Sequence, residues 1–345
     1  MRTPLLPPLF PISWSLYYRL GSATFSDLQY RPIDLNGSCP AQARAFFIKT
    51  LLTTLALVLS LAYASTVGTV TTSDGVKLAY IQAGPAAGQK LLFIPGWRQT
   101  AAEWRKQIEY FSGAGYQVTA YDHRGHGDSE KPSFGYRLSR LGADLNDVIN
   151  TLGLSNVSII GHSMGSSVTW ALWDQYPEQH SRIHKFVIVD QSSVLVQDPT
   201  WTQAQRDTWS AALFTPAQTY TFSANLSNEL VPFVTSMFTK EISAEDLDWA
   251  IAQNLKMSDE NAATLLINHA FMDWRDVLPR IDVPTLVLSG DASLNNATGI
   301  NWAATQIPGA RSYTFTKEER GSHFVFWESP ERFNQVVRDF VTPTG

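Results

Sequence analysis

The chain has 345 residues, of which 44% are hydrophobic and 17% are charged, and its formal net charge is −5. This is the composition of a globular protein, since a disordered chain carries fewer apolar and more charged residues. The mild negative charge and the lack of a run of basic residues argue against nucleic acid as a partner. The single cysteine, Cys39, excludes an intrachain disulfide and a cysteine-based metal site.

Residues 44–64 have the organisation of a signal peptide. Arg44 and Lys49 form a basic start, residues 51–61 form a short apolar core, and the segment ends in Ala-Tyr-Ala, which is typical of a cleavage site. The apolar core is short for a membrane span. We therefore expect a cleaved signal and a secreted protein.

The Pro-rich segment 1–43 precedes this pattern, although a signal peptide normally begins at the initiator methionine. It shows no helical or strand periodicity, so we predict an unstructured extension that could be an artefact of the assigned gene start. Two alternatives for residues 44–64 stay open. The segment could be an uncleaved N-terminal membrane anchor, or a short apolar helix packed on the domain.

From residue 65 onward, strand patterns and helix patterns alternate. Apolar runs bounded by turn residues predict strands over residues 67–72, 77–83, 90–94, 117–121, 157–160, 186–189, 285–289 and 313–316. Apolar residues at helical spacing predict a helix over residues 138–152, and helix-like stretches predict helices over residues 101–111, 166–176 and 331–341. This alternation predicts the α/β class, with a mostly parallel sheet, helices on both faces and a site at the carboxyl ends of the strands.

The alternation stops between residues 194 and 281, where we predict several short helices. This stretch is rich in Trp, Phe and Tyr. An inserted helical cap over the strand ends would explain it, with most of these aromatic residues forming the core of the cap. The few that face the cleft would give an apolar pocket. The domain at 65–345 therefore carries a cap at about 194–281.

Residues 161–165 read Gly-His-Ser-Met-Gly and lie between the predicted strand 157–160 and the predicted helix 166–176. Small residues two before and two after a serine let a strand turn sharply into a helix. Such a turn strains the serine backbone and exposes its hydroxyl at the helix N-terminus, which favours developing negative charge. The pattern predicts Ser163 as a nucleophile.

A serine hydroxyl needs a base, a group that orients the base, and donors for the resulting oxyanion. We predict His323 as the base, because its loop follows the last strand and returns to the strand ends. The predicted oxyanion donors are the backbone N–H groups of Met164 and Trp97. Trp97 comes shortly after the third predicted strand, 90–94. His123 and His126 lie in a Gly-rich loop, where we expect them to form hydrogen bonds rather than to bind a metal.

The chain from residue 77 to 341 resembles the α/β-hydrolase superfamily, and most of all its branch of haloperoxidase-like esterases, dehalogenases and lactonases. The resemblance rests on five motifs in the order of the family. They are Phe-Ile-Pro-Gly-Trp at 93–97, Asp-His-Arg-Gly-His-Gly-Asp-Ser at 122–129, Gly-His-Ser-Met-Gly at 161–165, Val-Pro-Thr-Leu-Val-Leu-Ser-Gly-Asp at 283–291 and Gly-Ser-His-Phe at 321–324. It implies an α/β-hydrolase fold and a Ser-acid-His triad that uses no cofactor and no metal.

The acid departs from the family pattern. The usual acid lies three residues after the glycine that ends the penultimate strand, but here that glycine is Gly290 and the third residue is Ser293. Asp291 is one residue on, where a side chain normally points elsewhere. Some members take the acid from the end of the strand after the elbow helix, where this chain has Asp190. We predict Asp190, with Asp291 as the alternative, and either aspartate could instead cap a turn.

Three functions are consistent with these motifs. The first is a serine hydrolase that cleaves a small carboxylic ester or lactone with an apolar portion through an acyl-enzyme. The second is a cofactor-free oxygenase in which a His-Asp dyad deprotonates an aromatic substrate. The third is a ligand-binding protein that retains the triad. Serine at position 163 tells against epoxide hydrolases and haloalkane dehalogenases of this fold, which use an aspartate nucleophile.

Overall fold

The computed structural model describes residues 65–342. The predicted extension 1–43, with Cys39, and the signal-like segment 44–64 lie outside the described residues. Among the helices of residues 65–342, none combines the length and the apolar character that crossing a membrane requires.

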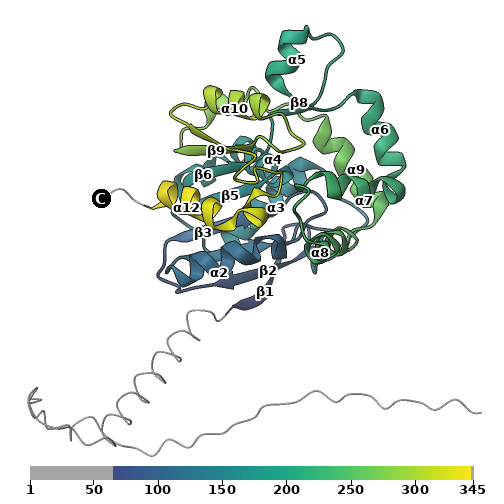
Figure 1. Ribbon diagram of the computed structural model, residues 1–345. Coiled ribbons are helices and arrows are strands. Elements are labelled where there is room, and N and C mark those ends of the chain that lie inside the picture. The colour runs from purple at the N-terminus through teal and green to yellow at the C-terminus, as the bar shows by residue number, and fades with distance from the viewer. Residues whose placement is uncertain (1–64, 343–345) are drawn as a thin grey trace, which may run out of the picture. The chain divides into compact units, whose positions relative to one another are not determined.

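An eight-stranded sheet forms the centre of the described domain, with the strand order β1-β2-β4-β3-β5-β6-β9-β10 (Figure 1). The strands are β1 (Thr66–Thr71), β2 (Lys77–Ala83), β3 (Lys90–Ile94), β4 (Gln117–Tyr121), β5 (Val157–His162), β6 (Ile183–Val189), β9 (Thr285–Gly290) and β10 (Arg311–Phe315). β2 pairs antiparallel with β1 and β4, and all other pairs are parallel. The predicted α/β class and mostly parallel sheet are therefore confirmed.

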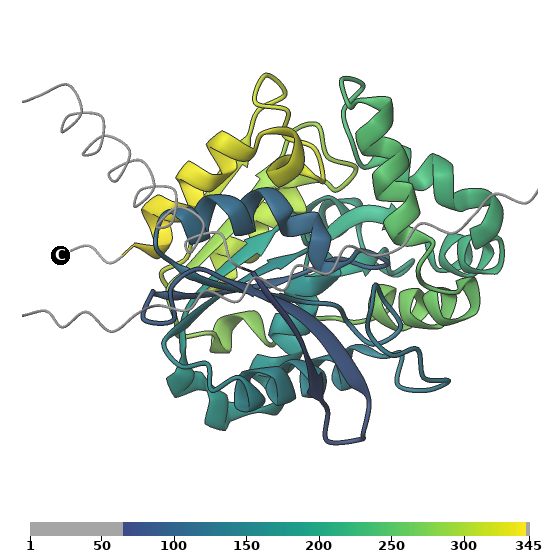
Figure 2. The ribbon, with the colours of Figure 1, turned by 90° about the horizontal axis from the view of Figure 1, so that it is seen from below.

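Helices cover both faces of the sheet, as Figure 2 shows for α2 and α12 on one side and α3 on the other. The helices of the first face are α2 (Arg105–Gly113), α11 (Val325–Glu328) and α12 (Pro330–Val341), and those of the second are α3 (Leu138–Thr151), α4 (Met164–Gln175) and α10 (Ala297–Gln306). The sequence did not predict α10. A short 3-10 turn, η1 (Ala101–Trp104), leads into α2.

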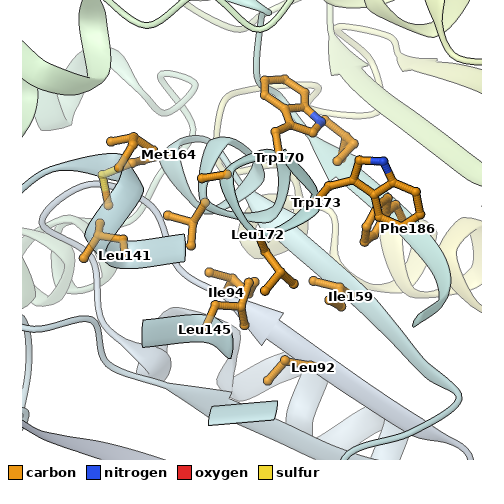
Figure 3. Packing of buried hydrophobic residues seen from close by; sticks show 14 of the residues in the cluster. Leu92, Ile94, Leu141, Leu145, Ile159, Met164, Trp170, Leu172, Trp173 and Phe186 are labelled. Atoms are coloured by element: carbon orange, nitrogen blue, oxygen red, sulfur yellow. The ribbon is translucent and has the colours of Figure 1, made fainter. Parts of the chain in front are cut away.

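The apolar residues at helical spacing on α3 are buried, which confirms the periodicity that predicted this helix. They belong to one apolar cluster with residues of α4 and of the central strands. Figure 3 shows side chains of this cluster, among them Leu145 of α3, Leu172 of α4 and Ile159 of β5. Every residue of β5 is buried, as expected for a parallel strand that is covered on both faces.

The insertion between β6 and β9 contains helices and two strands. Its helices are α5 (Gln203–Trp209), α6 (Pro216–Ala224), α7 (Leu226–Ser236), α8 (Ala244–Asn254), α9 (Asp259–Ala270) and the 3-10 turn η3 (Leu278–Arg280). β7 (Val194–Val196) and β8 (Ser210–Phe214) pair in parallel. The prediction of helices alone is wrong at these two strands, because a three-residue strand is too short to show a period and its partner is distant in sequence.

The topology brings the ends of β3 and β5 together. β3 lies between β4 and β5 in the sheet. The chain continues from β3 to β4 on one side and later adds β5 on the other side. The carboxyl ends of strands at such a reversal form a crevice in which α/β proteins bind ligands. The turn after β3 and the residue after β5 therefore meet at the same edge of the sheet.

Ser163 occupies that edge in a sharp turn between β5 and α4. Its backbone has φ 50° and ψ −124°, a region that few non-glycine residues adopt. The turn requires close packing of backbone, since a Cβ atom on Gly165 would lie 2.4 Å from the carbonyl oxygen of Ile94. Glycine at position 165 thus allows the elbow to rest against β3.

We expect Gly165→Ala to lower the free energy of unfolding by about 2 kcal/mol, because the added methyl group overpacks rigid backbone. Ser167→Ala on the same helix is the control: it removes a buried hydroxyl that has no hydrogen-bond partner within the described chain, so the change should stay within about 0.5 kcal/mol. Guanidinium denaturation of both variants measures the difference. Equal stability of the two variants would contradict the proposed close contact.

Candidate active site

His323 and Asp190 meet beside Ser163. His323 Nδ1 lies 2.5 Å from Asp190 Oδ2, and both side chains are buried. Nδ1–H therefore donates to the carboxylate, which leaves Nε2 with a lone pair. Ser163 and His323 both line one pocket. Within residues 65–342 no hydrogen bond joins the Ser163 hydroxyl to His323, a separation that is common in the absence of substrate.

Asp190 is held from several directions. It directly follows β6 with φ 51°, and its N–H donates to the carbonyl of Leu288 on β9. Its Oδ2 accepts hydrogen bonds from Ser293 Oγ at 2.6 Å and from Asn295 Nδ2 at 3.2 Å. Ser293 stands where the family usually has the acid, so the carboxylate comes from the neighbouring strand while a hydroxyl at the usual position supports it.

Asp291, the alternative acid, is not brought to His323. It is exposed, and its backbone N–H donates to Phe315 of β10. Among the described residues, its carboxylate forms no hydrogen bond or ion pair. The choice of Asp190 over Asp291 agrees with this placement.

Two backbone N–H groups near Ser163 are free to donate. In the turn after β3, the N–H of Gly96 donates to Glu103, that of Arg98 to His126 and that of Gln99 to the carbonyl of Gly96. For the N–H groups of Trp97 and Met164, the described part of the chain offers no acceptor. These are the two groups that the sequence predicted as oxyanion donors.

The pocket beside these groups is narrow and mostly apolar, with about 510 Å³ of empty space including its mouth. Its apolar lining comes from the insertion and from loops above the sheet: Trp97, Leu195, Leu213, Phe214, Phe233, Met237, Leu266, Leu294 and Phe324. A few aromatic residues of the insertion therefore do face the site, whereas others such as Trp274 are buried in the core. Across residues 65–342, no group of three or more His, Cys, Asp or Glu is placed to hold a metal ion.

The family described as alpha/beta hydrolase fold matches residues 90–330. The chain belongs to this family. It is 42% identical to a non-heme chloroperoxidase of Streptomyces lividans over 98 residues, which are 28% of this chain and 36% of that protein. It is 26% identical to a non-heme chloroperoxidase of Kitasatospora aureofaciens over 79% of this chain and 98% of that one.

The fold of this α/β-hydrolase is also similar to that of solved structures. The esterase from Exiguobacterium antarcticum superposes with a TM-score of 0.72 and 23% identity, covering 80% of this chain and 99% of that one. At this level of identity the similarity concerns the fold alone. The haloperoxidase-like resemblance found in the sequence is confirmed by these comparisons.

Two histidines of this α/β-hydrolase hold the turn after β3. His123 Nε2 lies 3.1 Å from the carbonyl oxygen of Pro95, to which it donates. His126 Nδ1 donates to the carbonyl of Arg124, so its Nε2 is the acceptor for the N–H of Arg98. The expectation that both histidines form loop hydrogen bonds is confirmed. Burial lowers the pKa of His123 to about 3 and that of His126 to about 4.

A buried carboxyl, which the sequence reading missed, links this turn to the elbow. Glu103 Oε1 accepts from the N–H of Gly96 and lies 3.3 Å from Nδ1 of His162. His162 Nε2 donates to the backbone carbonyl of His323, so Nδ1 carries the lone pair. Burial lowers the pKa of His162 well below its ordinary value, so its imidazole is neutral, and the repulsion between two lone pairs is relieved by a proton on Glu103. Burial raises the pKa of Glu103 well above its ordinary value, which agrees with a neutral carboxylic acid.

The same turn anchors the insertion through Arg98, whose side chain is 1% exposed. Its guanidinium donates to the carbonyls of Asn254 and Met257 and to the carboxylate of Asp259. Trp97 Nε1 donates to a carbonyl of α9. The segment that carries the predicted oxyanion donor therefore also positions the wall of the pocket. No motif marked Arg98 for this role in the sequence.

Acid should weaken the fold through His126. Because its folded pKa is about 4 and its ordinary value is 6.5, the unfolded chain binds the proton first, and the contribution of His126 to stability falls by about 1.4 kcal/mol per pH unit between pH 6.5 and 4. His126→Gln keeps a donor and an acceptor but cannot titrate. Urea denaturation should show the stability advantage of the native protein shrinking by about 1.5–2 kcal/mol between pH 6.5 and 5. Parallel stability curves for the two proteins would contradict this.

Proposed function

We propose that this protein is a serine hydrolase that cleaves a carboxylic ester or lactone with an apolar acyl or ring portion. The observation that carries the proposal is the hydrogen bond between His323 and Asp190 beside a serine in a strained elbow. It orients an imidazole whose free nitrogen can accept the serine proton. We also propose that the protein is secreted, which rests on the sequence of residues 44–64 alone.

The positions of these groups support the following reaction. Ser163 Oγ attacks the carbonyl carbon while His323 Nε2 takes its proton. The N–H groups of Trp97 and Met164 would donate to the oxyanion, and Asp190 stabilises the imidazolium that forms. His323 then protonates the leaving alcohol, and water activated by the same histidine hydrolyses the acyl-enzyme. For a lactone, the leaving hydroxyl stays attached to the acyl group.

The apolar lining of the pocket supports the proposal that the substrate has an apolar portion. Its apolar side chains come from separate elements, including Phe214 of β8, Phe233 of α7 and Leu266 of α9. Burying apolar surface against such walls yields about 25 cal/mol per Å² removed from water. The substrate portion next to the scissile carbonyl can therefore bind without charged partners.

The first test is labelling of the full chain with a fluorophosphonate, followed by peptide mass spectrometry. We expect label on Ser163 and none in Ser163→Ala, because only a serine activated by a base reacts with this probe. Thermal unfolding should be similar for the two proteins. Label on the folded native protein at another residue, or its persistence in Ser163→Ala, would refute the assignment of the nucleophile.

The position of Asp190 after β6 also supports a second candidate, the cofactor-free oxygenase, in which His323 and Asp190 deprotonate an aromatic substrate and Ser163 does not attack. Oxygen consumption separates the two functions. A hydrolase releases product without consuming oxygen, whereas the oxygenase consumes oxygen and keeps its activity when Ser163 is replaced by Ala.

The identity of the acid is tested by two matched variants. Asp190→Asn should lower kcat by about 10²–10⁴-fold, because an amide favours the wrong tautomer of His323. Asp291→Asn changes an exposed carboxylate that forms no hydrogen bond with His323, so kcat should stay close to that of the native enzyme. Steady-state kinetics with a p-nitrophenyl alkanoate measure both. A large loss in Asp291→Asn with little loss in Asp190→Asn would reverse the assignment.

A further inference from the structure

Gln99 stands out among the side chains that line the pocket. It is 2% exposed, and both polar atoms of its amide are buried without a hydrogen-bond partner among the described residues. The other amides at the pocket have at least one hydrogen bond: Asn295 Nδ2 donates to Asp190 and Gln191 Nε2 donates to the carbonyl of Ser192, whereas Asn295 Oδ1 is without a partner in the described chain. The large majority of buried side-chain polar atoms have a partner, so an unpaired amide facing a pocket indicates a missing ligand group.

The side chain of Gln99 is not needed to hold the turn, because its neighbours and its own backbone make the holding contacts. Trp97, Arg98 and Thr100 all direct side-chain hydrogen bonds to the α8–α9 region of the insertion. The backbone N–H of Gln99 closes the turn by donating to Gly96. In the segment 97–100, Gln99 is the residue whose side chain lines the pocket with no partner among the described residues.

Single polar atoms of Asn295 and His269, which line the same pocket, are also unpaired among the described residues. His269, on α9, is 4% exposed, and its Nδ1 has no partner in the described part of the chain. Burial lowers its pKa to about 3, so the imidazole is neutral at ordinary pH and adds no charge to the pocket. The unpaired groups are therefore neutral donors and acceptors within apolar walls, which matches a neutral polar group on the ligand.

We propose that Gln99 is a specificity residue that recognises an amide in the acyl or ring portion of the substrate, an inference that rests on the proposed hydrolase function. A carboxamide side chain offers one acceptor, Oε1, and donors on Nε2. A substrate amide offers the complementary N–H and carbonyl. A simple alkyl ester would leave both polar atoms of Gln99 buried and unpaired, which disfavours its binding.

The test uses the full chain and p-nitrophenyl esters of similar acyl length. In the first series, pentanoate has no polar group in the chain, 4-oxopentanoate has an acceptor, and N-acetylglycinate has the complete amide. In the second series, N-acetyl-β-alaninate carries the amide one methylene farther from the ester, and hexanoate is the alkanoate of matching length. Rates are corrected for the reaction of each ester with hydroxide and for release in the presence of Ser163→Ala. We expect one amide ester to exceed its alkanoate in kcat/KM by about 10–100-fold.

The variant Gln99→Met keeps an unbranched side chain of similar length and removes the amide. The preference for the amide ester should fall to about twofold or less, and kcat/KM for the alkanoate should rise, because methionine leaves no unpaired polar atom beside the alkyl chain. Gln82→Met on β2, at a residue outside the pocket lining, is the control and should retain the preference. A purely structural role of Gln99 would lower kcat/KM for both esters equally.

The outcomes separate the two proposals. Equal loss for both esters in Gln99→Met, or no preference for either amide ester in the native protein, overturns the role of Gln99 and leaves the hydrolase proposal standing. If the protein hydrolyses none of the esters and Ser163 takes up no fluorophosphonate label, the hydrolase proposal is overturned, and the inference with it.

Discussion

The hydrogen-bonded turn after β3 is the constraint on which the site depends. A turn this tight presents several N–H groups toward one edge of the sheet, and each would attract the nearest acceptor. Glu103 and His126 occupy the N–H groups of Gly96 and Arg98, while His123 fixes the carbonyl of Pro95. The N–H of Trp97 is left over. A free donor beside Ser163 thus results from satisfying its neighbours, each by a neutral buried side chain.

This turn also couples the chemistry to the shape of the pocket. The insertion is held by directional hydrogen bonds from Arg98 as well as by apolar contact. Arg98 belongs to the turn after β3, two residues from Gly96. The partner carboxylate, Asp259, is 47% exposed, so most of the constraint comes from the buried carbonyls of Asn254 and Met257. A displacement of the cap would therefore move the backbone that carries the free N–H of Trp97. In the proposed hydrolase, substrate selection and oxyanion stabilisation would therefore depend on one segment.

Local patterns allowed much of the fold to be predicted. β2, β3 and β4 have the predicted bounds, because each is an apolar run between turn residues. Ser163 was predictable because the elbow requires small residues at fixed spacing. The support of Asp190 by Ser293 and Asn295 was not, since it joins residues about one hundred positions apart with no motif. The role of Glu103 was not predictable either, because in the sequence it is an ordinary charged residue of a helix and only its burial in the structure shows the role.

The acid shows why spacing along the chain is a weaker guide than position in space. A triad needs a carboxylate at one location near Nδ1 of the histidine. β6 and β9 are adjacent parallel strands, so their carboxyl ends reach the same edge, and a residue after either can supply it. Placing Asp190 there requires φ 51°, a conformation that aspartate tolerates better than most residues. With the carboxylate on β6, the usual position after β9 is free to carry Ser293, whose hydroxyl donates to the acid and fixes its orientation. The carboxylate after β6 and the hydroxyl after β9 therefore meet beside His323, although the acid departs from the family spacing.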